Sequence, residues 1–327
     1  MRLVLFGQAA SWNHTLERLQ QYNAADSVVG LSDVCLGEYT DSDVTYSLSE
    51  LLEMYSKGEI DGVLQTEPEN TYYTNILKQI GIPDIYIIPE NIKENECIKR
   101  YSDIGPVLNQ IEFHLADHCN LNCRGCAHFS NLVSSPVYAD YEQFNKDIHK
   151  LSEYFSQIKT IYLLGGEPLL NKDIGSFIIS ARDAFPYACI TVVTNGILLL
   201  SISDDLIQII KDNNVLISIS DYECLDNNKI ITFIKEHELN AELRLEKESF
   251  AKHINIHGDS DKKVIFNQCM RRNCTFLSRG MMAACCTPFL NKYFNERYNE
   301  KLPEMDKNDC IDIYEPGLDG WKIKDRL

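Results

Sequence analysis

Three cysteines within eight positions, Cys119, Cys123 and Cys126, are the residues most suggestive of chemistry, in the spacing C-x3-C-x2-C. Three thiolates from one loop are enough to hold a [4Fe–4S] cluster by three of its irons. Because no fourth cysteine lies nearby, one iron of such a cluster stays open for a substrate or cofactor. Zinc would require a closed set of four ligands or one containing histidine, and His118 and His128 beside the loop keep that alternative open.

A second, looser group of cysteines lies between positions 269 and 310. The chain has twelve cysteines in all. In a reducing compartment, clustered thiols indicate metal binding rather than disulfides. The four scattered ones are predicted to be small buried residues: Cys35, Cys97, Cys189 and Cys224.

Composition excludes several classes of partner. The 327 residues are 44% hydrophobic and carry a net charge of −17. A surface this acidic repels nucleic acid and anionic membranes, so a small molecule or a peptide is the expected substrate. No apolar run approaches the roughly 20 residues of a membrane span. The apolar run at the start of the chain is too short for a secretory signal. We therefore expect a cytoplasmic protein.

The elements that would position these cysteines fall into two alternating series of strands and helices. Residues 1–90 are predicted to form a Rossmann-like α/β domain, with strands at 3–6, 28–31, 62–64 and 85–88 and helices at 12–22, 47–54 and 72–80. The turn after its first strand, at Gly7, lacks the G-x-G-x-x-G of dinucleotide-binding proteins. The polar residues 91–109 are expected to form a linker.

Residues 110–250 repeat the alternation and predict a second α/β unit, an open or closed parallel barrel. Its strands are expected at 111–115, 160–164, 190–194, 215–220 and 242–245, and its helices at 141–155, 174–185, 204–213 and 229–237. Chemistry in such a unit belongs at the carboxyl ends of the strands. The three-cysteine loop directly follows the first of them, and residues 251–327 form a cysteine-rich extension.

These features resemble the radical S-adenosylmethionine (SAM) superfamily, in which C-x3-C-x2-C follows the first strand of a partial (β/α)6 barrel. Further motifs end the next strands: Gly165-Gly166-Glu167, then Thr194-Asn195-Gly196, then Ser218 to Asp221. The resemblance implies that these strand ends, with Arg244 on the fifth strand, bind SAM. The implied cofactor-binding residues are Gly165, Gly166, Glu167, Thr194, Asn195, Ser218, Ser220 and Arg244.

The same resemblance implies the chemistry. The cluster on Cys119, Cys123 and Cys126 binds SAM, and an electron from a donor such as flavodoxin or ferredoxin releases a 5′-deoxyadenosyl radical that abstracts hydrogen from a substrate. One residue departs from the family pattern, because Gly125 stands where an aromatic residue usually precedes the third cysteine. We expect the missing ring to be supplied from elsewhere, with Phe129 as the candidate.

The spacing Cys269-x10-Gly280-x4-Cys285 resembles the auxiliary-cluster extensions called SPASM and twitch. It predicts a β-hairpin that turns at Gly280 and a second [4Fe–4S] cluster, with zinc or no metal as alternatives. The candidate ligands are Cys269, Cys274, Cys285 and Cys310. If the return arm of the hairpin reaches Cys286, this residue faces away from the cluster. Cys286 is then a buried small residue or a hydrogen-atom donor to a substrate radical.

Three functions remain open at this point. The first is a radical SAM enzyme acting on a small molecule such as a sugar, a nucleotide-sugar or an antibiotic precursor, which the Rossmann-like domain favours by fold analogy. The second is a maturase that modifies a ribosomal peptide. The third is an iron–sulfur electron carrier without SAM turnover, which the Gly165-Gly166-Glu167 motif disfavours.

Overall fold

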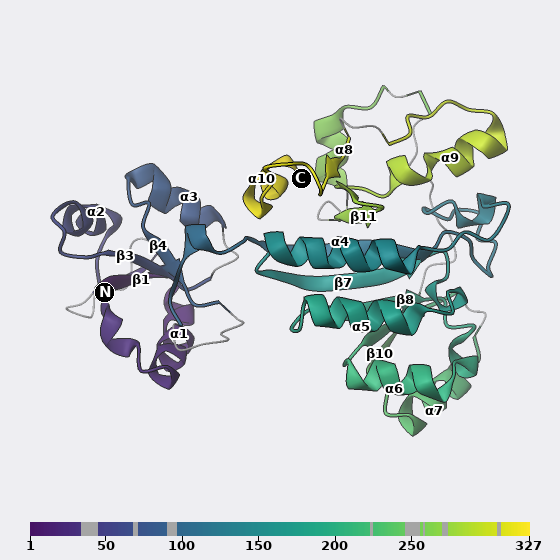
Figure 1. Cartoon of the computed structure of the whole chain (residues 1–327), viewed down its shortest axis with the longest axis horizontal. Coiled ribbons are helices and arrows are strands. Elements are labelled where there is room, and N and C mark those ends of the chain that lie inside the picture. The colour runs from purple at the N-terminus through teal and green to yellow at the C-terminus, as the bar shows by residue number, and fades with distance from the viewer. Residues whose placement is uncertain are drawn as a thin grey trace. The chain divides into compact units, whose positions relative to one another are not determined.

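The computed structural model consists of two units, Met1–Val107 and Leu108–Leu327, each with its own sheet (Figure 1). It describes residues 1–33, 45–67, 71–89, 97–222, 225–245, 256–257, 259–269, 274–305 and 309–327. Cys35 and Cys224 lie outside the described residues.

The first unit is a five-stranded sheet in the order β2-β1-β3-β4-β5. Strands β1 to β4 run parallel and β5 antiparallel. The first strand is wholly buried, as is typical of a parallel sheet covered on both faces. The predicted elements are confirmed as β1 (Leu3–Gly7), α1 (Ala9–Gln21), β2 (Val28–Asp33), α2 (Leu48–Ser56), β3 (Gly62–Gln65), α3 (Thr71–Ile80) and β4 (Ile85–Ile87).

The boundary of this unit differs from the expected linker. Strand β5 (Lys99–Arg100) pairs with β4, and Cys97 belongs to the core of the first unit. The unit therefore extends to Val107, whereas the polar sequence of this stretch indicated a linker up to residue 109. Long-range pairing with β4 outweighs the local polarity.

The second unit contains five strands in chain order along one sheet, from β6 at its centre to β10 at its edge. The pairs β7–β8, β8–β9 and β9–β10 are parallel. This confirms the α/β class and the predicted alternation: β6 (Val107–Ala116), α4 (Tyr141–Tyr154), β7 (Gln157–Gly165), α5 (Ile174–Ala184), β8 (Cys189–Thr194), α6 (Asp204–Asp212), β9 (Leu216–Asp221), α7 (Asn227–Glu236) and β10 (Ala241–Leu245).

The two faces of this sheet differ in chemistry, because successive side chains of a strand point to opposite faces. Ile111, Phe113 and Leu115 belong to the large apolar core that includes residues of α4 and α5. Glu112 and His114 alternate with them and therefore point to the opposite, inner face.

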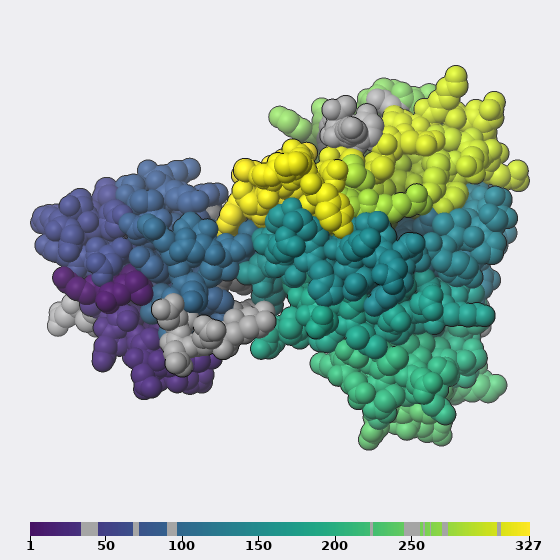
Figure 2. Space-filling model, in the orientation of Figure 1, coloured from purple at the N-terminus to yellow at the C-terminus, as the bar shows by residue number. Residues whose placement is uncertain are grey.

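The extension continues the same sheet on the other side of β6. It contains α8 (Lys262–Gln268), β11 (Phe276–Ser278), β12 (Met281–Ala283), α9 (Thr287–Tyr298), β13 (Ile311–Asp312) and α10 (Gly320–Arg326). β11 and β12 form the predicted hairpin, and Gly280 in its turn has a φ of 75°. Figure 2 shows the last segment, in yellow, against α4, where the Tyr154 hydroxyl donates to the Ile313 carbonyl at 2.8 Å. Among the described residues, no helix is long and apolar enough to cross a membrane.

Candidate functional site

The loop with Cys119, Cys123 and Cys126 is fastened to the end of β7 by backbone hydrogen bonds. The Gly166 amide donates to the Ala116 carbonyl at 2.7 Å, and the Glu167 amide donates to the His118 carbonyl at 3.1 Å. A Cβ at Gly166 would lie 2.2 Å from the His118 oxygen. The paired glycines are therefore required because the chain that enters the cysteine loop passes directly over them.

Gly166→Ala is expected to displace the cysteine loop and to lower both the iron bound after anaerobic reconstitution and the melting temperature. A methyl group cannot fit beside two backbone carbonyls without a backbone shift, which costs roughly 1–3 kcal/mol. Gly58→Ala is the control for the cost of a methyl group at a left-handed φ of 70°, because its Cβ would meet nothing within 4 Å. This backbone strain should lower the melting temperature and leave the iron content at the wild-type level. Wild-type iron content in Gly166→Ala would contradict the close contact between Gly166 and the cysteine loop.

Glu167 lies differently from what the sequence analysis expects of a SAM contact. Its side chain is fully buried, and both carboxylate oxygens accept bonds from the chain itself. One oxygen accepts from the Leu169 amide at 3.0 Å and the Thr194 hydroxyl at 2.8 Å, and the other from the Asn195 amide at 2.9 Å. Burial raises the pKa of Glu167, while these donors act in the opposite direction. The carboxylate joins the ends of β7 and β8 and presents no surface to a ligand.

Asn195 connects the end of β8 to the cysteine loop. Its amide nitrogen donates to the Asn120 side chain at 2.7 Å and to the Cys119 sulfur at 3.5 Å. The Leu121 amide donates to the same sulfur at 3.4 Å. Hydrogen bonds to cluster-ligating sulfurs tune the potential of an iron–sulfur cluster, so this arrangement fits Cys119 as a ligand.

The donor set of the loop fits a site-differentiated cluster. It offers three thiols, and burial raises the pKa of Cys119 to about 11, so the free thiol is protonated near neutral pH. Binding iron therefore releases a proton from this residue. Cys119, Cys123 and Cys126 would hold the cluster, and the strand ends beside them would receive SAM.

The remaining predicted SAM residues lie on β9 and β10. Ser218 is buried and donates to Glu242 at 2.6 Å, and the Arg244 guanidinium lies 3.4 Å from the same carboxylate. Ser220 is opposite Arg244 in the register of the two strands. A contact of these side chains with SAM stays a prediction.

Phe129 is not placed to replace the missing aromatic residue of the loop. It is 1% exposed, and its ring packs against Phe294 of α9 at a centroid separation of 5.6 Å. It belongs to a second apolar core with Phe276 and Cys286. The expectation that Phe129 meets adenine was wrong, because the extension covers its ring.

Three cysteines of the extension gather near the start of α9. The Cys274 thiol donates to Glu112 of β6 at 3.3 Å, and Cys285 and Cys274 both interact electrostatically with Cys286. A hydrogen bond from Cys286 lowers the pKa of Cys285 to about 6. Cys269 is exposed after α8 and Cys310 is buried before β13, and their ligand roles stay predictions.

Cys285 and Cys286 do not lie on a strand, so strand alternation does not turn Cys286 away from Cys285. β12 ends at Ala283, and α9 begins at Thr287, so the two cysteines lie between a strand and a helix. Their side chains are hydrogen-bonded to each other rather than turned to opposite faces.

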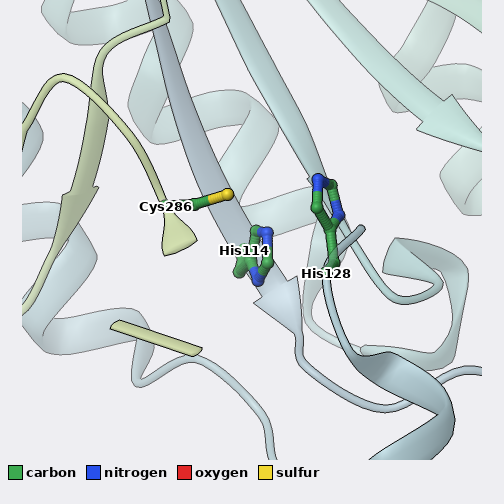
Figure 3. Close-up of side chains that lie close together, drawn as sticks. All are labelled: His114, His128 and Cys286. Carbon is green, nitrogen blue, oxygen red and sulfur yellow. The ribbon is translucent and has the colours of Figure 1, made fainter. Parts of the chain in front are cut away.

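Two histidines that the sequence analysis did not assign to the extension lie beside Cys286. Ligand atoms of His114, His128 and Cys286 all lie within 4.8 Å of one another (Figure 3). His114 is on β6 and His128 follows the cysteine loop, so packing alone brings them to a residue more than 150 positions away. The alternation of β6 placed His114 on the inner face, but no local signal pairs it with Cys286.

Comparison with known proteins gives one family match. Residues 114–222 match the model described as the radical SAM superfamily. This segment contains the cysteine loop and the motifs that end β7 and β8, which the structure brings to one edge of the sheet. The matched segment is of the radical SAM type. Radical SAM proteins use a [4Fe–4S] cluster and SAM. A search of curated proteins found no match to this chain.

Three solved structures are similar to this chain at low identity. BtrN in complex with AdoMet and 2-DOIA is 15% identical, with 59% of this chain and 77% of that chain covered and a TM-score of 0.36. The anSMEcpe structure with bound AdoMet is 19% identical, with coverage of 42% and 43% and a TM-score of 0.35. Streptococcus suis SuiB bound to S-adenosylmethionine is 14% identical, with coverage of 60% and 57% and a TM-score of 0.29.

Proposed function

We propose that this radical SAM protein is an enzyme that abstracts hydrogen from a small polar molecule bound at the inner face of its barrel sheet. The observation that supports this proposal is the polar lining of that face, beside the strand ends that hold the cysteine loop. When bound, the reduced cluster and SAM supply a 5′-deoxyadenosyl radical. The task of the chain is then to orient the substrate and to exclude water.

Among the residues that the structure describes, the lining combines carboxylates, hydroxyls and the Arg244 guanidinium. Burial raises the pKa of Tyr162 on β7 more than any other cause. The charges of Cys189, Glu112 and Glu242 raise it further, and the charge of Arg244 lowers it. Glu112 is 5% exposed, so its carboxylate is held away from bulk water. Carboxylates in such a site accept hydrogen bonds from hydroxyl or amino groups, which favours a sugar-like or amino-sugar-like substrate.

Substrate-dependent release of 5′-deoxyadenosine tests this substrate class. Pools of amino sugars and nucleotide-sugars should raise the release above the rate without substrate, and pools of peptides should not. Stimulation by peptides alone would instead support the second candidate, a peptide maturase.

We propose flavodoxin or ferredoxin as electron donor and the cytoplasm as location, in line with an acidic chain rich in thiols.

Tyr162→Phe is expected to lower the substrate-stimulated release about tenfold while leaving the unstimulated release unchanged. Loss of one hydrogen bond to a polar substrate costs about 1.4 kcal/mol, which is a factor of ten in rate. Tyr187→Phe is the matched control, because that side chain is 60% exposed. Equal stimulation in the two variants would show that Tyr162 does not contact the substrate.

A further inference from the structure

We propose that His114, His128 and Cys286 bind a single transition-metal ion, such as zinc, at the junction between the barrel sheet and the extension. This site is separate from the cluster on Cys119, Cys123 and Cys126, and it does not depend on SAM cleavage. It also replaces the hydrogen-donor role considered for Cys286, because a metal-bound thiolate carries no S–H group.

His114 has a buried lone pair. The side chain is 4% exposed, and Nδ1 lies 3.0 Å from an Asp117 oxygen. A carboxylate can only accept in this bond, so Nδ1 carries the proton and Nε2 carries the lone pair. This Nε2 is buried and makes no hydrogen bond. A buried acceptor without a partner destabilises the fold, and a metal ion would take up this lone pair.

Hydrogen bonds from Nδ1 hold both imidazole rings. Metal-binding histidines commonly donate their other ring N–H to a carboxylate or a backbone carbonyl, which fixes the tautomer. His114 donates to Asp117, which also accepts a hydrogen bond from the Tyr293 hydroxyl of α9. His128 donates from Nδ1 to the Gly165 carbonyl at 3.0 Å. Each ring is therefore oriented with a lone pair at Nε2 when it is neutral.

The separation and type of the ligand atoms fit a single metal ion. Tetrahedral zinc with nitrogen ligands at about 2.0 Å and sulfur at about 2.3 Å sets its ligand atoms roughly 3.5 Å apart. The atoms of His114, His128 and Cys286 lie within 4.8 Å of one another, so modest side-chain rotations would close them on one ion (Figure 3). A four-iron cube would hold them further apart.

The surroundings supply an apolar wall and a neighbouring thiol. Cys285 shares a hydrogen bond with Cys286, and Cys285 is therefore the candidate for a fourth ligand. The ring of Phe276 lies 5.0 Å from that of His114, and Phe276 packs in one apolar core with Cys286. An ion here would join β6, the segment after the cysteine loop and the start of α9, which fits a structural role.

Metal and sulfide analysis of anaerobically prepared protein, supplied with zinc, tests this site. We expect about four iron, four sulfide and one zinc per chain. His114→Gln and Cys286→Ser should each lose the zinc and keep the iron. The matched controls are His149→Gln on α4, where the ring bonds the exposed Asp183, and Cys189→Ser, an exposed thiol on β8; both should keep the zinc.

Two results would overturn the proposal. About eight iron and eight sulfide, half of them lost in Cys285→Ala but not in His114→Gln, would establish an auxiliary four-iron cluster on cysteines instead. Absence of a second metal in the wild type after zinc addition would show that the three side chains bind none.

Cobalt absorption tests the site even if His114→Gln fails to fold, because it does not require that variant. In a variant with Cys119, Cys123 and Cys126 replaced by alanine, added cobalt should give thiolate-to-cobalt charge-transfer absorption, which Cys286→Ser should reduce by at least half. Asp117→Asn in the same background should weaken cobalt binding about 10- to 100-fold, because the amide makes the His114 ring less basic. Unchanged cobalt affinity in a folded Asp117→Asn protein would contradict His114 as a ligand.

Discussion

Cys123→Ala is expected to release no 5′-deoxyadenosine from SAM in the presence of dithionite, whereas the wild-type protein releases it without any added substrate. The loop offers three thiols for the proposed cluster, and no further cysteine stands within it to take the place of a lost ligand. Iron at this site should therefore fall from about four per chain toward none. Chromatography of the quenched reaction and iron analysis of the same sample check both parts.

Cys189→Ala provides the matched control for this experiment. Cys189 begins β8 and Thr194 ends it, so the control lies about 16 Å from the strand end at the cysteine loop. Its iron content and its unstimulated release should equal those of the wild type. Release that persists in Cys123→Ala would refute the role of the loop. A wild-type protein with a full cluster and no release would support the electron carrier.

Glu167→Gln should lower the release of 5′-deoxyadenosine about 10- to 100-fold and also lower the melting temperature. The amide that replaces one carboxylate oxygen must point an N–H group at the amide of Leu169 or of Asn195, because backbone N–H groups face both oxygens. An unsatisfied buried donor costs roughly 1–3 kcal/mol, and the end of β8 is expected to move away from the cysteine loop.

The measurements on Glu167→Gln separate positioning from direct SAM contact. A positioning role predicts a lower melting temperature even without SAM, together with a weaker hold of Asn195 on Cys119 and therefore altered cluster spectra. A residue that only contacted SAM would weaken SAM binding and leave both properties unchanged. Glu236→Gln is the control, because this glutamate is exposed on α7.

The amino-acid sequence by itself determined the local elements and marked the cysteine loop as the candidate cluster site. Alternating apolar segments of strand and helix length predict the order of elements in both units, since periodicity reports which faces are buried. The C-x3-C-x2-C loop and the glycine motif at 165–166 could also be recognised from the sequence. Their chemistry depends on neighbours within a few residues. The turn at Gly280 is a further example, because the left-handed φ it adopts is a local property.

Only the tertiary structure decided which distant side chains share a site. The sequence marked Glu167 as a SAM contact, and packing of β7 against β8 buried its carboxylate instead. The sequence separated Cys285 from Cys286 by strand alternation, but β12 ends before either residue. His114, His128 and Cys286 come together because α9 packs beside β6, with Tyr293 bonded to Asp117. Such contacts arise from the packing of whole elements, which no local spacing encodes.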